Sequence, residues 1–226
     1  MGSFNVVEKI DGNVKINNVL ASVSDKTDLD ILVNTLAELN PDVHFYSTGN
    51  THKKIGEILG PRAEKMLTSV SDYTGQPEMQ GGLVKTLDFK IYLGLLSETY
   101  NEAHKQDIKR TGGIEFDMVI ANLYPFKQTI SREGISFEEA RGNIDIGGPC
   151  MVRASAKNFI RVVSVCNPSD YRAVADELKN NGCCISLSTR LELAKKSFSH
   201  TADYDTAIKN YLNDTDFEKL EDTYKF

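Results

Sequence analysis

The sequence predicts an α/β protein with a mainly parallel sheet, and two observations predict it. Short apolar runs of strand length alternate with longer segments whose apolar residues recur at helical spacing. Polar loops follow several of these runs, and in open parallel sheets ligands bind beyond the carboxyl ends of the strands. We divide the chain into an N-terminal tail or edge element (residues 1–17), one domain (18–213) and an acidic C-terminal tail (214–226).

The first unit reads as a strand, a loop and a helix. Residues 19–23 are a compact apolar run, and apolar residues from 29 to 39 keep helical spacing. Thr27 and Asp30 have the spacing of a capping box at the start of that helix. The polar side chains at the end of the strand are Ser22, Ser24, Asp25 and Lys26.

The second unit repeats this order. Residues 44–47 form the strand, and a helix with Ile55 and Leu59 follows. The loop between them offers Thr48, Gly49, Asn50 and Thr51. Hydroxyls and a glycine at a helix N-terminus suit a phosphate. The alternative is a plain N-cap, in which Thr51 serves only its own helix.

A long polar, glycine-rich loop covers residues 72–87. Loops of this length inside a compact domain are more often functional than idle. Lys85 and Thr86, after Val84, offer a cation and a hydroxyl for a phosphate or a developing oxyanion. The alternative for Lys85 is a solvated surface lysine.

The middle of the chain predicts a helix, a central strand and a short acidic helix. The first helix lies within residues 91–109 and is broken by glycines at 112 and 113. The strand is expected within the segment 116–126 and stops at Pro125. The short helix covers 137–140. This strand would place three more residues at its end: Asn122, Leu123 and Tyr124.

Residues 143–157 are the stretch with the clearest site character. Asp145 precedes Ile146 and the glycine pair Gly147 and Gly148, with a helix predicted from Pro149. Backbone N–H groups at such a turn can take an anion or a polar carbonyl. Lys157 lies about 12 Å along the helix, but lysine is long and helix side chains lean toward the N-terminus, so we expect it to reach back. The alternative is a glycine-rich connection with a solvated lysine.

The C-terminal third predicts one more strand and two helices. The strand covers residues 161–166, and a helix starting near Pro168 ends at Gly182. Thr189 and Glu192 form a second capping box, which opens a helix of about 24 residues through Leu212.

Composition excludes several classes of protein. A net charge of −6 argues against a nucleic-acid surface, since duplex binding requires phosphate neutralisation. No apolar run reaches the roughly 20 residues of a membrane span, and no signal peptide is evident, so we expect a cytoplasmic protein. The four cysteines and four histidines form no metal-ligand or disulfide pattern, so we expect free thiols and neither metal nor cofactor.

Several collinear motifs resemble one family, the IMP cyclohydrolase domain of the bifunctional purine-biosynthesis protein, from about residue 20 to 212. The motifs are Ser22-Val23-Ser24-Asp25-Lys26-Thr27, Ser47-Thr48-Gly49-Asn50-Thr51, Val70-Ser71-Asp72-Tyr73-Thr74-Gly75, Pro77-Glu78-Met79, Val84-Lys85-Thr86-Leu87, Asn122-Leu123-Tyr124-Pro125-Phe126, Ile144-Asp145-Ile146-Gly147-Gly148-Pro149, Arg153-Ala154-Ser155-Ala156-Lys157-Asn158 and Phe198-Ser199-His200-Thr201-Ala202-Asp203-Tyr204-Asp205.

The resemblance implies a methylglyoxal-synthase-like fold, a Rossmann-like three-layer arrangement in which helices flank a mainly parallel sheet. It implies closure of a formamido-imidazole-carboxamide ribonucleotide (FAICAR) to IMP with loss of water. In that family a folate-dependent transformylase domain follows the cyclohydrolase domain, and this sequence stops before the position where it would begin. We therefore expect a stand-alone cyclohydrolase whose substrate a separate transformylase supplies. Family members are dimers, which implies a homodimer; no nucleic acid or membrane partner is implied.

The resemblance also implies site residues. The catalytic set would be Lys85, Tyr124, Asp145 and Lys157, with the first two facing the oxyanion and the last two relaying the carboxamide proton. The substrate-binding set would be Ser22, Ser24, Asp25, Lys26, Thr48, Gly49, Asn50, Thr51, Val84, Thr86, Asn122, Leu123, Ile146, Gly147 and Gly148.

Two departures from the family pattern leave alternatives open. Leu83 stands in place of an arginine and Asp88 in place of a histidine, which lowers positive charge near a phosphate. A weakened purine-nucleotide-binding or regulatory module is therefore the second hypothesis. The third is a methylglyoxal-synthase-like phosphate lyase, in which the motifs at 122–126 and 145–157 would have no purpose.

Overall fold

The computed structural model describes residues 6–77, 79 and 84–225. A five-stranded sheet lies at its centre in the order β4-β3-β2-β5-β6, and each neighbouring pair is parallel. The mainly parallel sheet predicted from the alternation of strands and helices is therefore confirmed. The strands are β2 (Asn18–Val23), β3 (His44–Ser47), β4 (Leu67–Ser69), β5 (Met118–Asn122) and β6 (Val163–Val165).

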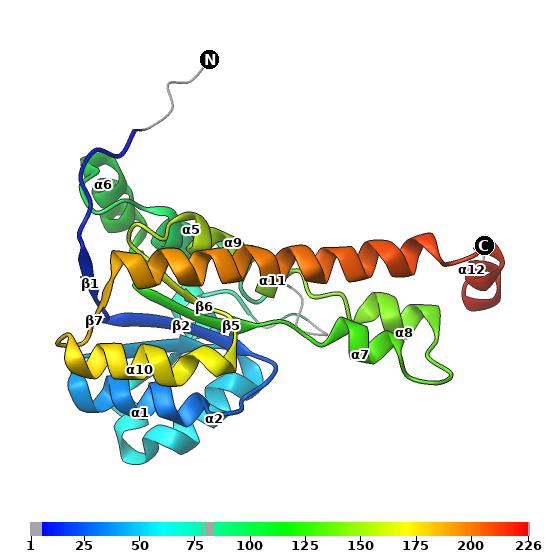
Figure 1. The fold of residues 1–226 in the computed structure, drawn as a ribbon, viewed down its shortest axis with the longest axis horizontal. Helices are drawn as coiled ribbons and strands as arrows, with labels where there is room; N and C mark the ends of the chain where they lie inside the picture. Colours follow the sequence, from blue (N-terminus) through cyan, green and yellow to red (C-terminus); the bar gives the residue numbers. More distant parts are fainter. Residues whose placement is uncertain (1–5, 78, 80–83, 226) are drawn as a thin grey trace.

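Helices cover both faces of this sheet and make three layers (Figure 1). On one face lie α1 (Leu29–Leu39), α2 (Gly49–Leu59) and α10 (Tyr171–Asn180). On the other lie α5 (Phe89–Leu96), α9 (Gly147–Lys157) and α11 (Leu187–Asn213). Smaller elements complete the layers: η1 (Gly60–Arg62), α3 (Ala63–Met66), α4 (Val70–Thr74), α6 (Glu102–Thr111) and η3 (Pro168–Asp170).

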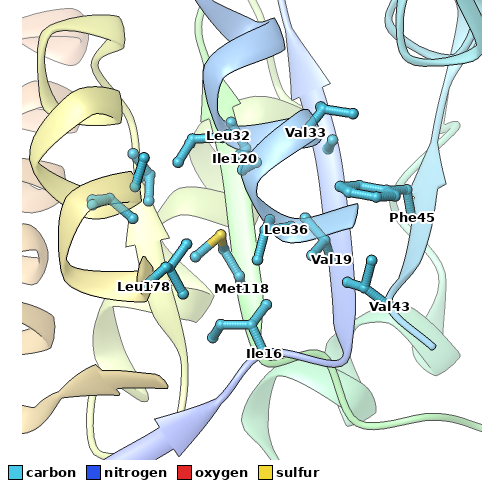
Figure 2. Packing of buried hydrophobic residues seen from close by; sticks show 14 of the residues in the cluster. Ile16, Val19, Leu32, Val33, Leu36, Val43, Phe45, Met118, Ile120 and Leu178 are labelled. Atoms are coloured by element: carbon cyan, nitrogen blue, oxygen red, sulfur yellow. The ribbon is translucent and has the colours of Figure 1, made fainter. Parts of the chain in front are cut away.

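The two faces of the sheet have separate apolar cores because side chains alternate along each strand. Val19 of β2 packs with the α1 and α10 layer, whereas its neighbour Leu20 packs with the α5, α9 and α11 layer. Figure 2 shows the first core, where Leu36 of α1 and Leu178 of α10 meet Met118 of β5. A strand buried on both faces has to be apolar throughout, and β5 is buried along its whole length.

A two-stranded antiparallel sheet closes one end of the domain. It pairs β1 (Asn13–Lys15) with β7 (Cys184–Ser186). Arg190 of α11 is buried beside it and donates to the carbonyl oxygens of Ile185 and Asp11 at 2.6 Å each. Because a buried guanidinium must satisfy its N–H groups, this residue ties the start of the described chain to α11.

A small group of helices lies beyond the sheet, where α11 extends past it (Figure 1). The group comprises α7 (Phe126–Ile130), α8 (Phe137–Gly142) and α12 (Phe217–Thr223). Tyr211 of α11 stacks on Phe137 of α8, with ring centroids 6.2 Å apart. The segment 214–226, expected as an acidic tail, thus contains a helix.

Two of the predicted capping boxes are wrong. The N-cap of α1 is Asp28, which has a left-handed backbone (φ 57°) and makes no capping bond through its side chain. Helix α11 begins earlier than expected, because Ser186 accepts a hydrogen bond from the Thr189 backbone N–H. Both errors arise because several hydroxyl and carboxyl residues lie side by side at these helix starts.

The single helix expected within residues 91–109 is instead two helices. Helix α5 ends at Leu96, and the carbonyl of its C-cap, Ser97, accepts from Asn158 and Arg161, both buried side chains distant in sequence. Helix α6 then begins at Glu102, and its N-cap is Asn101, whose side chain accepts from the His104 backbone N–H at 3.2 Å. Contacts made across the fold therefore end a helix that the local pattern would continue.

Candidate active site

A cavity of about 610 Å³ opens beyond the carboxyl ends of β2, β3 and β5. Loops from five separate parts of the chain line it, as expected for a ligand site on an open parallel sheet. Its described lining residues are Ser22, Val23, Ser24, Lys26, Thr48, Gly49, Asn50, Thr51, Val84, Lys85, Thr86, Leu87, Asn122, Tyr124, Gly142, Ile144, Asp145, Ile146, Gly147, Gly148 and Met151.

The loop after β2 carries a positive charge that backbone carbonyl groups hold in place. The Lys26 ammonium donates to the carbonyl oxygens of Val23 and Ser24 at 3.0 and 3.2 Å. The Ser22 hydroxyl lies 3.4 Å from that of Thr48, which joins this loop to the next one. Two neighbouring strand ends therefore present a cation and two hydroxyls to the same space.

Asn122 holds the loop after β2 in place from the adjacent strand. Its side-chain oxygen accepts from the Asp25 backbone N–H, and its amide donates to the Asp25 carbonyl, each at 2.8 Å. The Asp25 carboxylate accepts from the Thr27 backbone N–H at 2.9 Å, and Asp25 is not among the described lining residues. Hydrogen bonding from the Thr27 side chain, together with that from its backbone N–H, lowers the pKa of Asp25. Asp25 thus contributes backbone geometry, and its carboxylate does not line the cavity.

Replacing Asn122 by alanine is expected to destabilise the protein by about 1–3 kcal/mol, because both backbone groups of Asp25 lose a largely buried partner. Urea unfolding followed by circular dichroism measures the change. Asn143→Ala is the control, since its side chain makes one exposed bond to the Glu139 carbonyl and should cost no more than about 0.5 kcal/mol. Equal stability of both variants would contradict this role of Asn122.

The first turn of α2 faces the cavity. Its N-cap, Thr48, makes no capping bond through its side chain, so the hydroxyl is available to the cavity. Gly49 has a left-handed backbone (φ 47°), which disfavours other residues there. The Thr51 hydroxyl donates to the Val23 carbonyl at 3.1 Å and accepts the Val23 N–H at 3.0 Å. Thr51 therefore fastens α2 to β2 and does not act as the cap of its own helix.

Lys85 lies beside this helix start. A methyl group placed on Gly49 would be 3.5 Å from the Lys85 ammonium, so the lysine adds charge where the helix dipole is already positive. Val84 and Thr86 line the cavity on either side of it in sequence. Helix start, ammonium and hydroxyls together favour an anionic group.

Asp145 lines the cavity from the loop before α9. Its carboxylate accepts from the Gly148 backbone N–H at 2.9 Å, and its own backbone N–H donates to the Tyr204 hydroxyl at 2.7 Å. Burial raises the pKa of Asp145, while the N–H groups of Gly148 and Tyr124 oppose the rise. A carboxyl with a raised pKa beside a polar cavity is suited to take or give a proton.

The glycine pair after Asp145 is required by close packing. A methyl group on Gly147 would lie 2.5 Å from the Thr86 hydroxyl oxygen, and one on Gly148 would lie 2.4 Å from the Asp145 carboxylate. Helix α9 begins at Gly147, two residues before the proline at which we expected it. Leu123, expected at the site, is buried behind Gly148 and does not line the cavity.

Tyr124 and Ile146 form part of the mouth of the cavity. Both line it, and they are 55% and 59% exposed. The described lining combines two lysines, one carboxylate, one phenol and a row of hydroxyl and amide groups. Such a set can bind a polar anion at one side and exchange protons at the other.

Of the four expected catalytic residues, Lys157 is the one that is not in the described lining of the cavity. It is exposed at the last position of α9, six residues beyond Met151, the last residue of this helix in the described lining, and so about 9 Å further along the helix. It does not belong to the described lining. The structure thus does not show the long side chain reaching back to the described lining, and the role expected for Lys157 stays a prediction.

Asp88, which we considered a source of repulsion near a phosphate, has a structural role. It is 8% exposed and caps α5, accepting from the Lys90 backbone N–H at 2.8 Å. It does not belong to the described lining of the cavity. Leu83, the other departure, lies outside the described residues.

Within the described ranges, no three or more His, Cys, Asp or Glu side chains are grouped so that they could hold a metal ion. None of the helices that the structure describes is both long and apolar enough to cross a bilayer.

Fold and cavity together define an α/β domain with a polar, anion-accepting site at the carboxyl edge of a parallel sheet. Residues 28–150 match the family model of the MGS-like domain, and the chain belongs to that family. Residues 155–226 match the model of the AICARFT/IMPCHase bienzyme. The crystal structure of ForH is similar, with a TM-score of 0.70 and 29% sequence identity, over 86% of this chain and 97% of that one.

Curated relatives agree with both models. The chain is 44% identical to the bifunctional purine biosynthesis protein PurH of Ruminiclostridium cellulolyticum, over 93% of this chain and 40% of that protein. It is 45% identical to PurH of Acetivibrio thermocellus, over 88% and 37%, and 43% identical to PurH of Bacillus subtilis, over 90% and 38%. The chain thus spans about 40% of the length of these relatives. The resemblance to the IMP cyclohydrolase domain and the methylglyoxal-synthase-like fold are confirmed.

Proposed function

We propose that this chain is an IMP cyclohydrolase, which closes FAICAR to IMP with loss of water in the cytoplasm. The observation that carries the proposal is the convergence of Lys85, Tyr124 and Asp145, from three separate loops, on one cavity. The likeness to PurH proteins over most of this chain supports the same reaction. A separate transformylase would supply the substrate, and a homodimer is the assembly that we propose.

The phosphate and ribose would bind at the α2 side of the cavity. Lys26, Thr48 and the N–H groups at the start of α2 offer charge and donors there, and the Lys85 ammonium beside Gly49 would lie between the phosphate and the reacting groups, within reach of both. Ser22, Ser24, Asn50, Thr51 and Thr86 would complete this side. Asn122, Ile146 and Gly147 would line the base.

The chemistry would proceed at the Tyr124 and Asp145 side. The carboxamide nitrogen attacks the formyl carbon, a nitrogen–carbon bond forms, and the former carbonyl oxygen becomes an oxyanion. Lys85 and Tyr124 would stabilise that charge, and Asp145 would accept a proton from the carboxamide nitrogen. The oxygen leaves as water with one proton from that nitrogen and one from the formamido nitrogen. Because both reacting groups belong to one molecule, holding them close supplies much of the rate.

The purified chain incubated with FAICAR tests the proposal. Ring closure changes the ultraviolet spectrum, and mass spectrometry identifies IMP as a product lighter by one water. Binding of IMP without turnover would instead select the nucleotide-binding module. Asp88, one of the two departures that suggested this second hypothesis, caps α5 and is not among the described lining residues, so it gives that hypothesis little support.

Lys85→Met is expected to weaken IMP binding about tenfold at low salt, since a charge-assisted contact is worth roughly 1.5–3 kcal/mol and methionine keeps the length without the charge. Isothermal titration calorimetry at two ionic strengths measures the change, and the wild type should lose affinity as salt rises. Lys53→Met on the exposed side of α2 is the control with the same charge change and should bind like the wild type. Equal affinities for all three proteins would contradict a phosphate at this end.

A further inference from the structure

Tyr204 of α11 lies outside the described lining of the cavity, yet it contacts both loops that carry the proposed proton chemistry. Its hydroxyl accepts the Asp145 backbone N–H at 2.7 Å across 59 residues of sequence. Its ring meets that of Phe126 edge on, with centroids 6.2 Å apart. Phe126 follows Tyr124 by two residues and donates its backbone N–H to the Tyr124 carbonyl at 2.8 Å. Tyr204 therefore contacts the backbone of Asp145 directly and that of Tyr124 through Phe126.

The surroundings of Tyr204 make this contact stiff. The residue is 8% exposed and Phe126 is 1% exposed, so neither ring has room to turn. Tyr204 belongs to the apolar core on the α9 and α11 face, which also holds Met151 and Val152 of α9. The hydrogen bond thus joins a tyrosine in the packed interior to the backbone of Asp145, a residue that lines the cavity.

We propose that Tyr204 is a positioning residue, which fixes the Asp145 carboxylate relative to Tyr124 by binding both loops to α11. This inference rests on the proposed function. Asp145 is held from two directions, by Tyr204 at its backbone N–H and by the Gly148 N–H at its carboxylate. Loss of the first leaves the carboxylate attached to α9 but free to shift with the loop. A displacement of about 1 Å at a reacting group can cost up to 10²-fold in rate.

Tyr204→Phe tests the inference, and Tyr211→Phe is its matched control. Tyr211 lies two helical turns further along α11, and its ring also packs against Phe126, with centroids 5.8 Å apart. Its hydroxyl is buried without a hydrogen-bond partner among the described residues. Both variants remove one buried hydroxyl from the same helix, but only the first removes a bond to the Asp145 loop.

Three measurements separate positioning from packing. Hydrogen–deuterium exchange at the Asp145 amide should accelerate in Tyr204→Phe and stay unchanged in Tyr211→Phe. The kcat of Tyr204→Phe should fall about tenfold with KM changed less than about threefold, since the phosphate side is untouched. The acid limb of its kcat against pH should also move, because the surroundings of the carboxylate change.

Exchange and kcat equal to those of the Tyr211 variant would overturn the inference. So would an equal fall in kcat for both variants together with equal losses of Tm, because that result indicates packing alone. If the wild-type chain does not convert FAICAR, the proposed function fails, but the exchange experiment still decides whether Tyr204 holds the Asp145 loop.

Discussion

Asp145→Asn is expected to lower kcat by about 10³-fold, within the roughly 10²–10⁴-fold range of general acid–base catalysis. The amide cannot accept the carboxamide proton, yet it has nearly the same shape. Its oxygen can still accept the Gly148 N–H that the carboxylate now accepts at 2.9 Å. The loss should therefore appear in kcat, with the affinity for IMP little changed. Steady-state kinetics with FAICAR and calorimetry with IMP measure the two quantities.

Although Asp145→Asn should lower kcat, it should leave the stability of the protein at neutral pH unchanged or raise it. Burial raises the pKa of Asp145 in the folded protein above its unfolded value of about 3.9. Stability from this group is then complete below the unfolded pKa and is lost as pH rises through the folded pKa. The wild type carries that cost at pH 7 and the asparagine variant does not. Its Tm should equal or exceed that of the wild type at pH 7, and the difference should vanish near pH 3.

Dependence of the rate on pH gives a further check. The acid limb of the wild-type profile should lie above the ordinary carboxyl range, since only the ionised Asp145 accepts a proton. The asparagine variant should lack that limb. A variant that keeps a kcat within fivefold of the wild type, or the same acid limb, would show that another group takes the proton.

Much of the fold followed from local sequence patterns. Strands β2, β3 and β5 were predicted because buried parallel strands are continuous apolar runs, and α1 because its leucines keep helical spacing. The pairing of β1 with β7 was not predicted, since it joins residues about 170 positions apart through three pairs only. Strand β4 is three residues long and half-buried, which leaves too little pattern to recognise.

Candidate residues chosen by strand topology mostly line the cavity, whereas Lys157, chosen by side-chain reach, is not in its described lining; the role of each stays a prediction. Ser22, Thr48 and Asn122 lie at or next to the carboxyl ends of β2, β3 and β5, so the sheet brings them to one edge. Lys157 is not in the described lining, and its inclusion depended on a side chain reaching back along a helix, which sequence spacing alone does not decide. Tyr204 was present in a motif, but no local signal indicates that a tyrosine on a distant helix supports Asp145.

Gly148→Ala is expected to lower kcat by about 10²-fold and the stability by about 1–3 kcal/mol. Its methyl group would lie 2.4 Å from the Asp145 carboxylate oxygen and 2.8 Å from Leu123. Leu123 is buried and packed, so the carboxylate is the group that yields. The substitution thus moves Asp145 without changing its chemistry. Kinetics with FAICAR and urea unfolding measure the two effects.

Gly56→Ala is the matched control within α2. Its methyl group would meet Leu67 at 3.6 Å, an ordinary van der Waals contact, so the variant should keep its activity and gain up to about 1 kcal/mol from helix propensity. Asp145→Asn with Gly148→Ala completes the experiment. If the glycine acts through the carboxylate, the double variant should be little slower than Asp145→Asn alone. Additive losses would mean that Gly148→Ala disturbs the cavity by a route that does not involve Asp145.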